Sequence, residues 1–285
     1  HFPVEVSKRA GEAGFLALYI DEAHGGLGLS RLDASLIFEQ LAQGCVSTTA
    51  YLTIHNMASW MIANWASNAF RETWLASLIS GERLASYCLT EPGAGSDAAS
   101  LLTRAVRERS GGRDDYLISG SKMFISGAGS TDLLVVMART GEANSGAAGI
   151  TAFAVPADSE GISYGNNEDK MGWKSQPTRL VSFDEVRVPA ANRLGEEGEG
   201  FKLAMKGLDG GRLNIASCSL GAAQHALTLS RDYLQQRKQF GRELAAFQAL
   251  QFKFADMATE LISARLMTRH AAWRLDQADP EASAH

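Results

Sequence analysis

The chain switches from helix-like to strand-like patterning and back, and this order restricts the folds open to it. Within residues 1–83, apolar side chains recur at steps of three and four, as at Leu32 and Leu36, which is the spacing of one helix face. Residues 84–197 carry more glycine and short apolar runs, and helical spacing returns within 198–285. We therefore predict an α+β chain with an N-terminal helical domain, a central β-barrel domain and the first part of a C-terminal helical bundle.

The middle segment contains five apolar runs that predict strands. These runs are residues 85–89, 116–125, 133–137, 150–155 and 180–188. Turn clusters such as Ser110-Gly111-Gly112 and Gly165-Asn166-Asn167 separate them. Because these strands follow one another without intervening helices, they favour an antiparallel barrel, or else a sandwich.

The helical segments carry their own start and stop signals. Gly25–Gly28 interrupts the first one, and Ser30 is a candidate N-cap for the helix that follows. After residue 200, two apolar faces predict two long helices joined by a turn near Gly241. Their members are Ile215, Cys218, Ala222, Leu229 and Tyr233, and Phe247, Leu250, Phe254, Met257 and Leu261. Two helices cannot bury both faces, so a partner subunit or further sequence must cover them.

Composition excludes several functional classes. The 285 residues carry 27 basic and 32 acidic side chains, a formal net charge of -5, which disfavours nucleic-acid binding. No apolar run approaches the ~20 residues needed to span a bilayer. The cysteines Cys45, Cys88 and Cys218 lie far apart, so we expect a reducing compartment and no disulfide framework; no metal-ligand spacing is visible either. The chain begins without Met, and we expect it to be a fragment of a longer protein.

The densest chemical signal is Tyr87-Cys88-Leu89-Thr90-Glu91-Pro92-Gly93-Ala94-Gly95-Ser96-Asp97. Its glycines allow close approach to a flat ring or a phosphate, and the hydroxyls of Thr90 and Ser96 offer directional hydrogen bonds. A generic surface turn is the alternative. Gly93, Gly95 and Ala98 also fit the dinucleotide pattern GxGxxA, but more strand follows this loop where a Rossmann unit needs a helix, so we reject that interpretation.

This stretch resembles the first signature of the acyl-CoA dehydrogenase family. The resemblance continues, in family order, over nearly the whole chain: Gly120–Ser126, Lys170–Trp173, Asp209–Arg212, Arg237–Gly241 and Phe247-Gln248. It implies a helical domain, a β-barrel and a helical bundle, which is the order derived above from patterning alone.

The resemblance implies that FAD is bound by three segments of the chain. The residues assigned to it are Tyr87, Cys88, Leu89, Thr90, Gly95, Ser96, Phe124, Ile125, Ser126, Arg237, Phe240, Phe247 and Gln248. In such a site, Thr90 bonds the flavin edge, Phe124 and its neighbours cover the other side of the flavin, and Arg237 with Gln248 reaches FAD across a subunit interface. The family often has Trp where Phe124 stands; Phe keeps the apolar ring but loses the N–H donor. Without the resemblance, Phe124 could equally be a residue of the hydrophobic core, and Arg237 could be a solvated residue at a helix end.

Substrate binding is implied for Ser96, Asp209 and Arg212, which would meet the acyl-CoA. Residues 172–179, 210–212 and 214–221 are most similar to the isobutyryl-CoA dehydrogenase branch of the family. Asp209 departs from the Asn expected there and would carry a charge next to an anionic cofactor.

The implied reaction is α,β-dehydrogenation of a short branched acyl-CoA, isobutyryl-CoA to methacrylyl-CoA in valine catabolism. An electron-transferring flavoprotein would take the electrons, and the functional unit would be a homotetramer. The location would be the mitochondrial matrix in a eukaryote and the cytoplasm in a bacterium. The catalytic base is expected as a Glu beyond residue 285, so a chain ending at His285 should have little activity, and Glu91 belongs to the flavin loop instead.

Three alternatives remain open. The protein could prefer another short acyl chain, it could be an acyl-CoA oxidase or flavin monooxygenase on the same fold, or it could be a non-catalytic binding or scaffold protein. Oxygen consumption without an electron acceptor would distinguish the second, and a colourless purified protein would favour the third.

Overall fold

The computed structural model describes residues 2–279 and residue 282. It divides into two compact units, each built from segments that are distant in sequence. Unit 1 consists of His1–Leu29 and Tyr51–Gly211, and unit 2 consists of Ser30–Ala50 and Arg212–His285. The long helices α2 (Arg31–Trp65) and α4 (Gly200–Gln236) each contribute residues to both units.

Unit 1 contains α1 (Val4–Glu12), η1 (Glu22–His24), α3 (Asn68–Ser80) and the second part of α2. Ser67 begins α3 by accepting the backbone N–H of Phe70 at 3.3 Å, which satisfies one of the unpaired donors at the helix start. Met61 and Ile62 of α2 and Leu78 of α3 are fully buried in one core. Burying each such side chain contributes about 1.5–3 kcal/mol.

A buried histidine joins α2, α3 and the first strand. The Nδ1 atom of His55 accepts the backbone N–H of Ala85 at 3.1 Å, so Nε2 carries the proton of the neutral ring. Nε2 lies 2.9 Å from the carbonyl oxygen of Leu78 and 3.2 Å from the hydroxyl of Ser59. Burial lowers the pKa of His55 to about 4, against the opposing effect of the Leu78 carbonyl.

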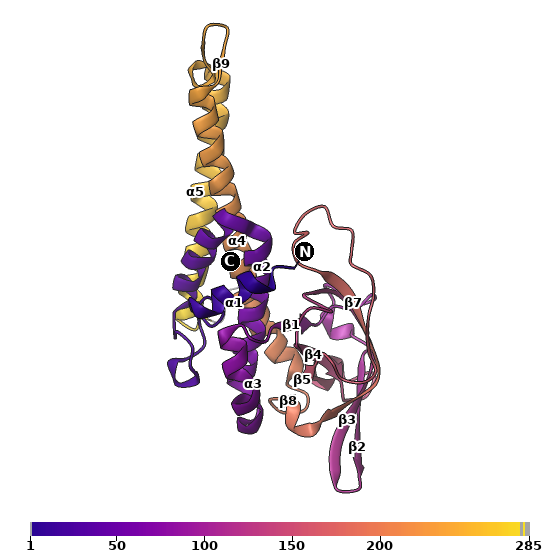
Figure 1. Ribbon diagram of the computed structural model, residues 1–285. Coiled ribbons are helices and arrows are strands. Elements are labelled where there is room, and N and C mark those ends of the chain that lie inside the picture. The colour runs from indigo at the N-terminus through magenta and orange to yellow at the C-terminus, as the bar shows by residue number, and fades with distance from the viewer. Residues whose placement is uncertain (1, 280–281, 283–285) are drawn as a thin grey trace. The chain divides into compact units, whose positions relative to one another are not determined.

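The rest of unit 1 is built on an eight-stranded mixed sheet (Figure 1). Its strands are β1 (Ala85–Cys88), β2 (Arg104–Ser110), β3 (Arg113–Ser126), β4 (Leu133–Arg139), β5 (Ile150–Pro156), β6 (Ile162–Tyr164), β7 (Thr178–Pro189) and β8 (Arg193–Leu194). They lie in the order β6-β7-β3-β2-β4-β5-β8, with β1 paired to β4. Short helices η2 (Ala98–Ser100), η3 (Gly146–Gly149) and η4 (Ala190–Asn192) connect some of them.

The prediction of an antiparallel barrel is wrong. β1 pairs parallel to β4 from Ala85–Leu133 to Cys88–Val136, and β2 also meets β4 in parallel, at Arg104–Arg139. Among the described residues, the path of paired strands ends at β6 and β8 and does not close. β5 occupies one edge of β4 along its whole length, so β1 and β2 must share the other edge. The chain therefore leaves that edge after β1 and returns to it as β2.

β4 is the central strand, and it separates two cores. Leu133, Val135 and Met137 face the core shared with α2 and α3. Leu134 and Val136 face a second core, formed with side chains from β3, β5 and β7, as the alternation of side chains along a strand requires. Every residue of β4 is buried, which explains its continuous apolar sequence.

All five predicted strands are present, most of them longer than their apolar runs. β2 was not predicted, because its sequence RAVRERS is mostly charged and largely exposed and forms no apolar run. The turn predicted at Ser110-Gly111-Gly112 lies between β2 and β3, whose register runs from Arg104–Ser119 to Ser110–Arg113.

Unit 2 contains the first part of α2, most of α4, and α5 (Gln248–Asp276). The two long helices and the turn near Gly241 are confirmed: α4 and α5 are joined by the hairpin β9 (Lys238–Gln239) and β10 (Arg242–Glu243) and by η5 (Leu244–Ala246) (Figure 1). The predicted N-cap is also confirmed, since the hydroxyl of Ser30 accepts the N–H of Asp33 at 3.0 Å and the Asp33 carboxylate accepts the N–H of Ser30.

Ionic contacts hold the three helices of unit 2 together. The buried carboxylate of Glu39 on α2 accepts hydrogen bonds from Arg265 at 2.7 Å and Arg269 at 3.4 Å, both on α5. Arg265 also donates to Gln224 of α4 at 2.8 Å. At the other end of α5, the carboxylate of Asp276 accepts the N–H groups of Arg31 and Leu32 at 2.6 and 3.0 Å, which caps the start of α2.

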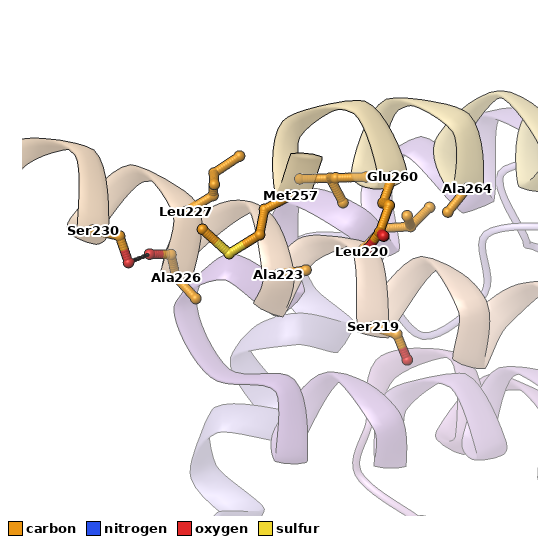
Figure 2. A pocket seen from close by; sticks show the side chains of 10 residues that line it. Ser219, Leu220, Ala223, Ala226, Leu227, Ser230, Met257, Glu260 and Ala264 are labelled. Carbon is orange, nitrogen blue, oxygen red and sulfur yellow. Dashed lines mark hydrogen bonds between the residues drawn. The ribbon is translucent and has the colours of Figure 1, made fainter. Parts of the chain in front are cut away.

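Much of the apolar surface of α4 and α5 is exposed. The exposed apolar side chains are Leu229, Tyr233, Phe252, Met257, Ile262, Leu266, Met267 and Trp273. A pocket of about 470 Å³ is lined by residues of both helices, among them Leu220 and Leu227 of α4 and Met257 and Leu261 of α5. Figure 2 shows the side chains that line it. In the described part of the chain, no helix is both long and apolar enough to cross a membrane.

Candidate cofactor site

The densest sequence motif forms an excursion from the sheet, residues 89–103, between β1 and β2. Its first turn is closed by two backbone hydrogen bonds, from Glu91 N–H to the Ala94 carbonyl at 3.0 Å and from Ala94 N–H to the Glu91 carbonyl at 3.2 Å. The excursion then passes through η2 and rejoins the edge of β4. It is a structured loop with both ends anchored on one strand.

A buried ion pair closes the base of the excursion. The carboxylate of Glu91 accepts the backbone N–H groups of Leu102 at 2.6 Å and Thr103 at 2.9 Å, and the ammonium of Lys122 at 2.7 Å. Lys122 is completely buried and donates a second bond to the Leu89 carbonyl at 3.1 Å. Burial alone would raise the pKa of Glu91, but Lys122 and the Leu102 N–H outweigh it and hold that pKa below its usual range.

A second buried cation holds the far end of the excursion. Arg139, at the end of β4, donates to the carbonyl oxygens of Leu101 at 3.2 Å, Ala99 at 2.8 Å and Gly146 at 2.9 Å. Its backbone N–H also binds the Thr103 carbonyl at 2.7 Å. The side chain therefore holds η2, η3 and the end of the excursion against β4.

Strand β3 presents Phe124 beside this excursion. The N–H of Met123 binds the carbonyl oxygen of Thr90 at 2.8 Å, which joins β3 to the loop. Pairing with β7 shifts in register between Lys122 and Ile125, both of which are buried, and Phe124 between them has a φ of 60°. This bulge turns the Phe124 ring outward, where 55% of the residue is exposed. A left-handed φ costs a non-glycine residue about 1–2 kcal/mol, which is characteristic of functional positions.

The surface around the loop fits a planar ring with polar edges. Within the described part of the chain, the hydroxyls of Thr90, Ser96 and Ser126 have no hydrogen-bond partner. A Cβ atom added at Gly93 or Gly95 would meet nothing within 4 Å, so there is open space beside the loop. Hydroxyls that can donate or accept, next to an exposed aromatic ring, match an isoalloxazine ring, which has polar edges and apolar faces.

Several predicted cofactor residues point into the cores instead. Cys88 and Ile125 are buried in the core of the sheet, and Leu89 in the core shared with the helices. Tyr87 donates its hydroxyl to the carbonyl oxygen of Ala204 at 3.3 Å. Burial raises the pKa of Cys88 to about 12, so this thiol is not a nucleophile near neutral pH. Only the backbone of Cys88, Leu89 and Ile125 is available to a ligand.

The remaining predicted residues lie on α4, in the connection that follows it and at the start of α5. Asp209 is partly buried and Arg212 is exposed, one on each side of the boundary between the units. In unit 2, the ring centroids of Phe240 and Phe247 lie 6.2 Å apart, and Phe240 is 93% exposed with a φ of 53°.

Along the sequence, Arg237 precedes and Gln248 follows this pair of rings, and both residues are exposed. The turn thus carries four of the residues assigned to FAD, of which Arg237 and Gln248 were predicted to reach it across an interface. All four belong to unit 2, whereas the excursion belongs to unit 1.

Sequence reasoning missed the supporting roles of Lys122 and Arg139. Both interrupt or directly follow apolar runs that form buried strands. A charge in such a run is a signal of a buried partner, since an unpaired buried charge is very costly. The identity of the partner, however, depends on the tertiary fold.

Family models match successive parts of the chain. Residues 1–82, 86–186 and 198–285 match the N-terminal, middle and C-terminal domains of acyl-CoA dehydrogenases, respectively. The chain is 53% identical to "Isobutyryl-CoA dehydrogenase, mitochondrial" of Bos taurus, over 97% of this chain and 65% of that protein. It is 50% identical to the protein of the same name in Dictyostelium discoideum, over 99% of this chain and 67% of that one.

A solved structure, butyryl-CoA dehydrogenase from Megasphaera elsdenii, superposes with a TM-score of 0.91 at 36% identity, covering 98% of this chain and 73% of that one. The chain thus spans about two thirds to three quarters of the length of these relatives. Matches to all three domains, in order, together with this identity confirm the resemblance. The chain belongs to the acyl-CoA dehydrogenase family.

Proposed function

We propose that this protein is an FAD-dependent dehydrogenase of short branched-chain acyl-CoA, which converts isobutyryl-CoA to methacrylyl-CoA in valine catabolism. The observation that carries the proposal is the identity of 53% and 50% with two isobutyryl-CoA dehydrogenases, against 36% with a butyryl-CoA dehydrogenase. The flavin part is supported by the hydroxyls of Thr90 and Ser96 in the excursion and of Ser126 on β3, together with the exposed ring of Phe124.

The chain's own residues would bind and orient the reactants. Thr90 and Ser126 offer hydrogen bonds to the ring edge, and Phe124 supplies an apolar surface that excludes water from it. Ser96 and Arg212 would hold the acyl-CoA, with Arg212 pairing with its anionic part. When bound, FAD supplies the redox chemistry by accepting a hydride from the β carbon.

Removal of the α proton requires a carboxylate that can reach the substrate. Glu91 cannot serve, because its two oxygens are already engaged by Leu102, Thr103 and Lys122. These donors favour the ionised form and occupy three of the roughly four acceptor sites of the carboxylate, which is buried at the base of the excursion. The proposed base is therefore a glutamate beyond residue 285, as the family resemblance implies.

The proposed partners, like the proposed base, are those that the family resemblance implies. Electrons would pass to an electron-transferring flavoprotein, and the functional unit would be a homotetramer. The exposed apolar side chains of α4 and α5 support association, since patches of this kind mark interfaces. The location would be the mitochondrial matrix if the source is a eukaryote and the cytoplasm if it is a bacterium.

The test is a panel of acyl-CoA substrates assayed on the full-length protein with an artificial electron acceptor. Isobutyryl-CoA is expected to give the highest kcat/KM. The proposed FAD is bound non-covalently, so flavin is expected in the supernatant after heat precipitation. A wide kcat/KM margin in favour of butyryl-CoA or octanoyl-CoA would contradict the branch assignment, and flavin retained by the precipitate would contradict non-covalent binding. Turnover coupled to oxygen consumption, without an acceptor, would favour an oxidase or a monooxygenase instead.

A further inference from the structure

The excursion contributes hydroxyls and backbone to the candidate site, but few side chains within it hold it in shape. Pro92, Gly93, Gly95 and Ser96 are all exposed. Its geometry must therefore be imposed from beneath, by groups that do not themselves face the ligand. Glu91 and Lys122 are the pair placed to do this.

Their hydrogen bonds connect the three backbone segments that bear on the site. Glu91 lies at the start of the excursion and binds the N–H groups of Leu102 and Thr103 at its end. Lys122 binds Leu89, the first residue of the excursion, as well as Glu91 itself. Lys122 also directly precedes the bulge that turns Phe124 outward.

The positions of Thr90 and Phe124 thus depend on one buried pair. Thr90 lies between Leu89 and Glu91, which are both held by Lys122, and its carbonyl oxygen is bound by Met123 N–H at 2.8 Å. A shift of the Lys122 ammonium should therefore move Thr90 through both of its neighbours in the chain, Leu89 and Glu91. It also reaches Phe124 through the backbone of β3.

We infer that Glu91 and Lys122 are positioning residues for the flavin: without facing it, they fix the Thr90 hydroxyl and the Phe124 ring in the relative arrangement that binds it. This inference rests on the proposed FAD-dependent function. Because the two charges of the pair cancel, we expect it to act on flavin binding through the positions of the groups that it holds, and not through an electric field at the flavin. The flavin site should therefore depend on the length and hydrogen bonding of both side chains as well as on their charges.

The experiment compares Lys122→Met, which removes the ammonium but keeps the length of the chain, with Glu91→Gln and the conservative Lys122→Arg. The matched control is Arg187→Met, which removes a cation from the same sheet, where Arg187 pairs with Glu108 at 2.6 Å and Asp115 at 3.1 Å. Each full-length protein is measured for FAD dissociation constant, resolution of the flavin absorption bands and amide hydrogen exchange, at a temperature at which circular dichroism shows it folded.

Lys122→Met is expected to weaken FAD binding at least tenfold and to blur the flavin bands. It should also speed exchange at Leu102, Thr103 and Met123 while leaving the amides of β5 protected. Lys122→Arg should recover part of the affinity, and Arg187→Met should bind FAD within twofold of the parent. If Lys122→Met does not fold, Glu91→Gln carries the same expectations.

A folded Lys122→Met or Glu91→Gln protein with unchanged FAD affinity and an unchanged flavin spectrum would overturn the inference. Faster exchange spread evenly over the whole of unit 1 would also overturn it, since that is the result of a merely structural role. If the unmodified protein binds no flavin, the proposed function fails. The exchange rates of Leu102, Thr103 and Met123 then decide separately whether the pair orders the excursion.

Discussion

Acid should destabilise unit 1 through His55, and the size of the effect follows from its environment. The ring is completely buried, accepts the Ala85 N–H and donates to the Leu78 carbonyl, so it is neutral in the folded protein. Its pKa is about 4 in the fold, against 6.5 for an unperturbed histidine. Protonation therefore favours the unfolded chain: the stabilisation is fully present above pH 6.5 and is lost as the pH falls toward 4.

The difference between the two pKa values corresponds to a contribution of about 3 kcal/mol to the free energy of unfolding. About 2 kcal/mol of this contribution should already be lost at pH 5. The assay is urea unfolding at pH 7 and pH 5, followed by tryptophan fluorescence; Trp60, Trp65, Trp74 and Trp173 lie in unit 1, and Trp273 lies in unit 2. The loss of unfolding free energy between the two pH values should be smaller by about 2 kcal/mol in His55→Gln than in the parent. His225→Gln, which alters an exposed histidine on α4, is the matched control and should behave like the parent.

Comparing the pH difference within each variant removes any change that His55→Gln causes at both pH values. If His55→Gln loses as much stability between pH 7 and pH 5 as the parent does, His55 is not the group responsible and the reasoning from its burial is refuted.

Two further changes probe the site. Arg237→Ala should weaken FAD retention about tenfold in the full-length protein through loss of a pyrophosphate ion pair, measured as bound flavin per chain after gel filtration. Unchanged affinity would contradict the cross-subunit role, and Arg231→Ala, near the end of α4, is the control. Gly120→Ala should lower the unfolding free energy by about 1–3 kcal/mol, because Gly120 has a φ of 144° and an added Cβ would lie 2.7 Å from the Cα atom of Thr103. Gly44→Ala, whose added Cβ meets nothing within 4 Å, should not lower it, and equal thermal midpoints for the two variants would show that the clash is relieved without cost.

The sequence was sufficient for elements whose pattern is local. Apolar spacing predicted α4 and α5, and the continuous apolar run of β4 predicted a buried strand. β2 was not predicted, because a charged and exposed strand has no apolar pattern in its sequence. The parallel pairing of β1 and β2 with β4 escaped for another reason: strand direction within a sheet depends on where the chain returns after a long connection, which no local pattern records.

The candidate site divides in the same way. Thr90, Ser96 and Phe124 could be proposed because their motif resembles that of a known family. The contact between Glu91 and Lys122 could not, since these residues lie 31 positions apart and meet only once β3 packs beneath the excursion. The burial of Cys88 and Ile125 likewise follows from which face of each strand meets the core.

The excursion leaves one edge of β4 and returns to the same edge. The pairing of β1 and β2 with β4 therefore does not depend on the number of residues inside the excursion. Its ends are fixed by pairs at Val136 and Arg139, so a residue inserted or deleted between Pro92 and Asp97 shifts no strand. The entropy of closing a loop grows only slowly with its length, by about 0.6 kcal/mol per doubling. A change of loop length at this position would therefore reshape the candidate flavin-binding surface while leaving the strands around it in register.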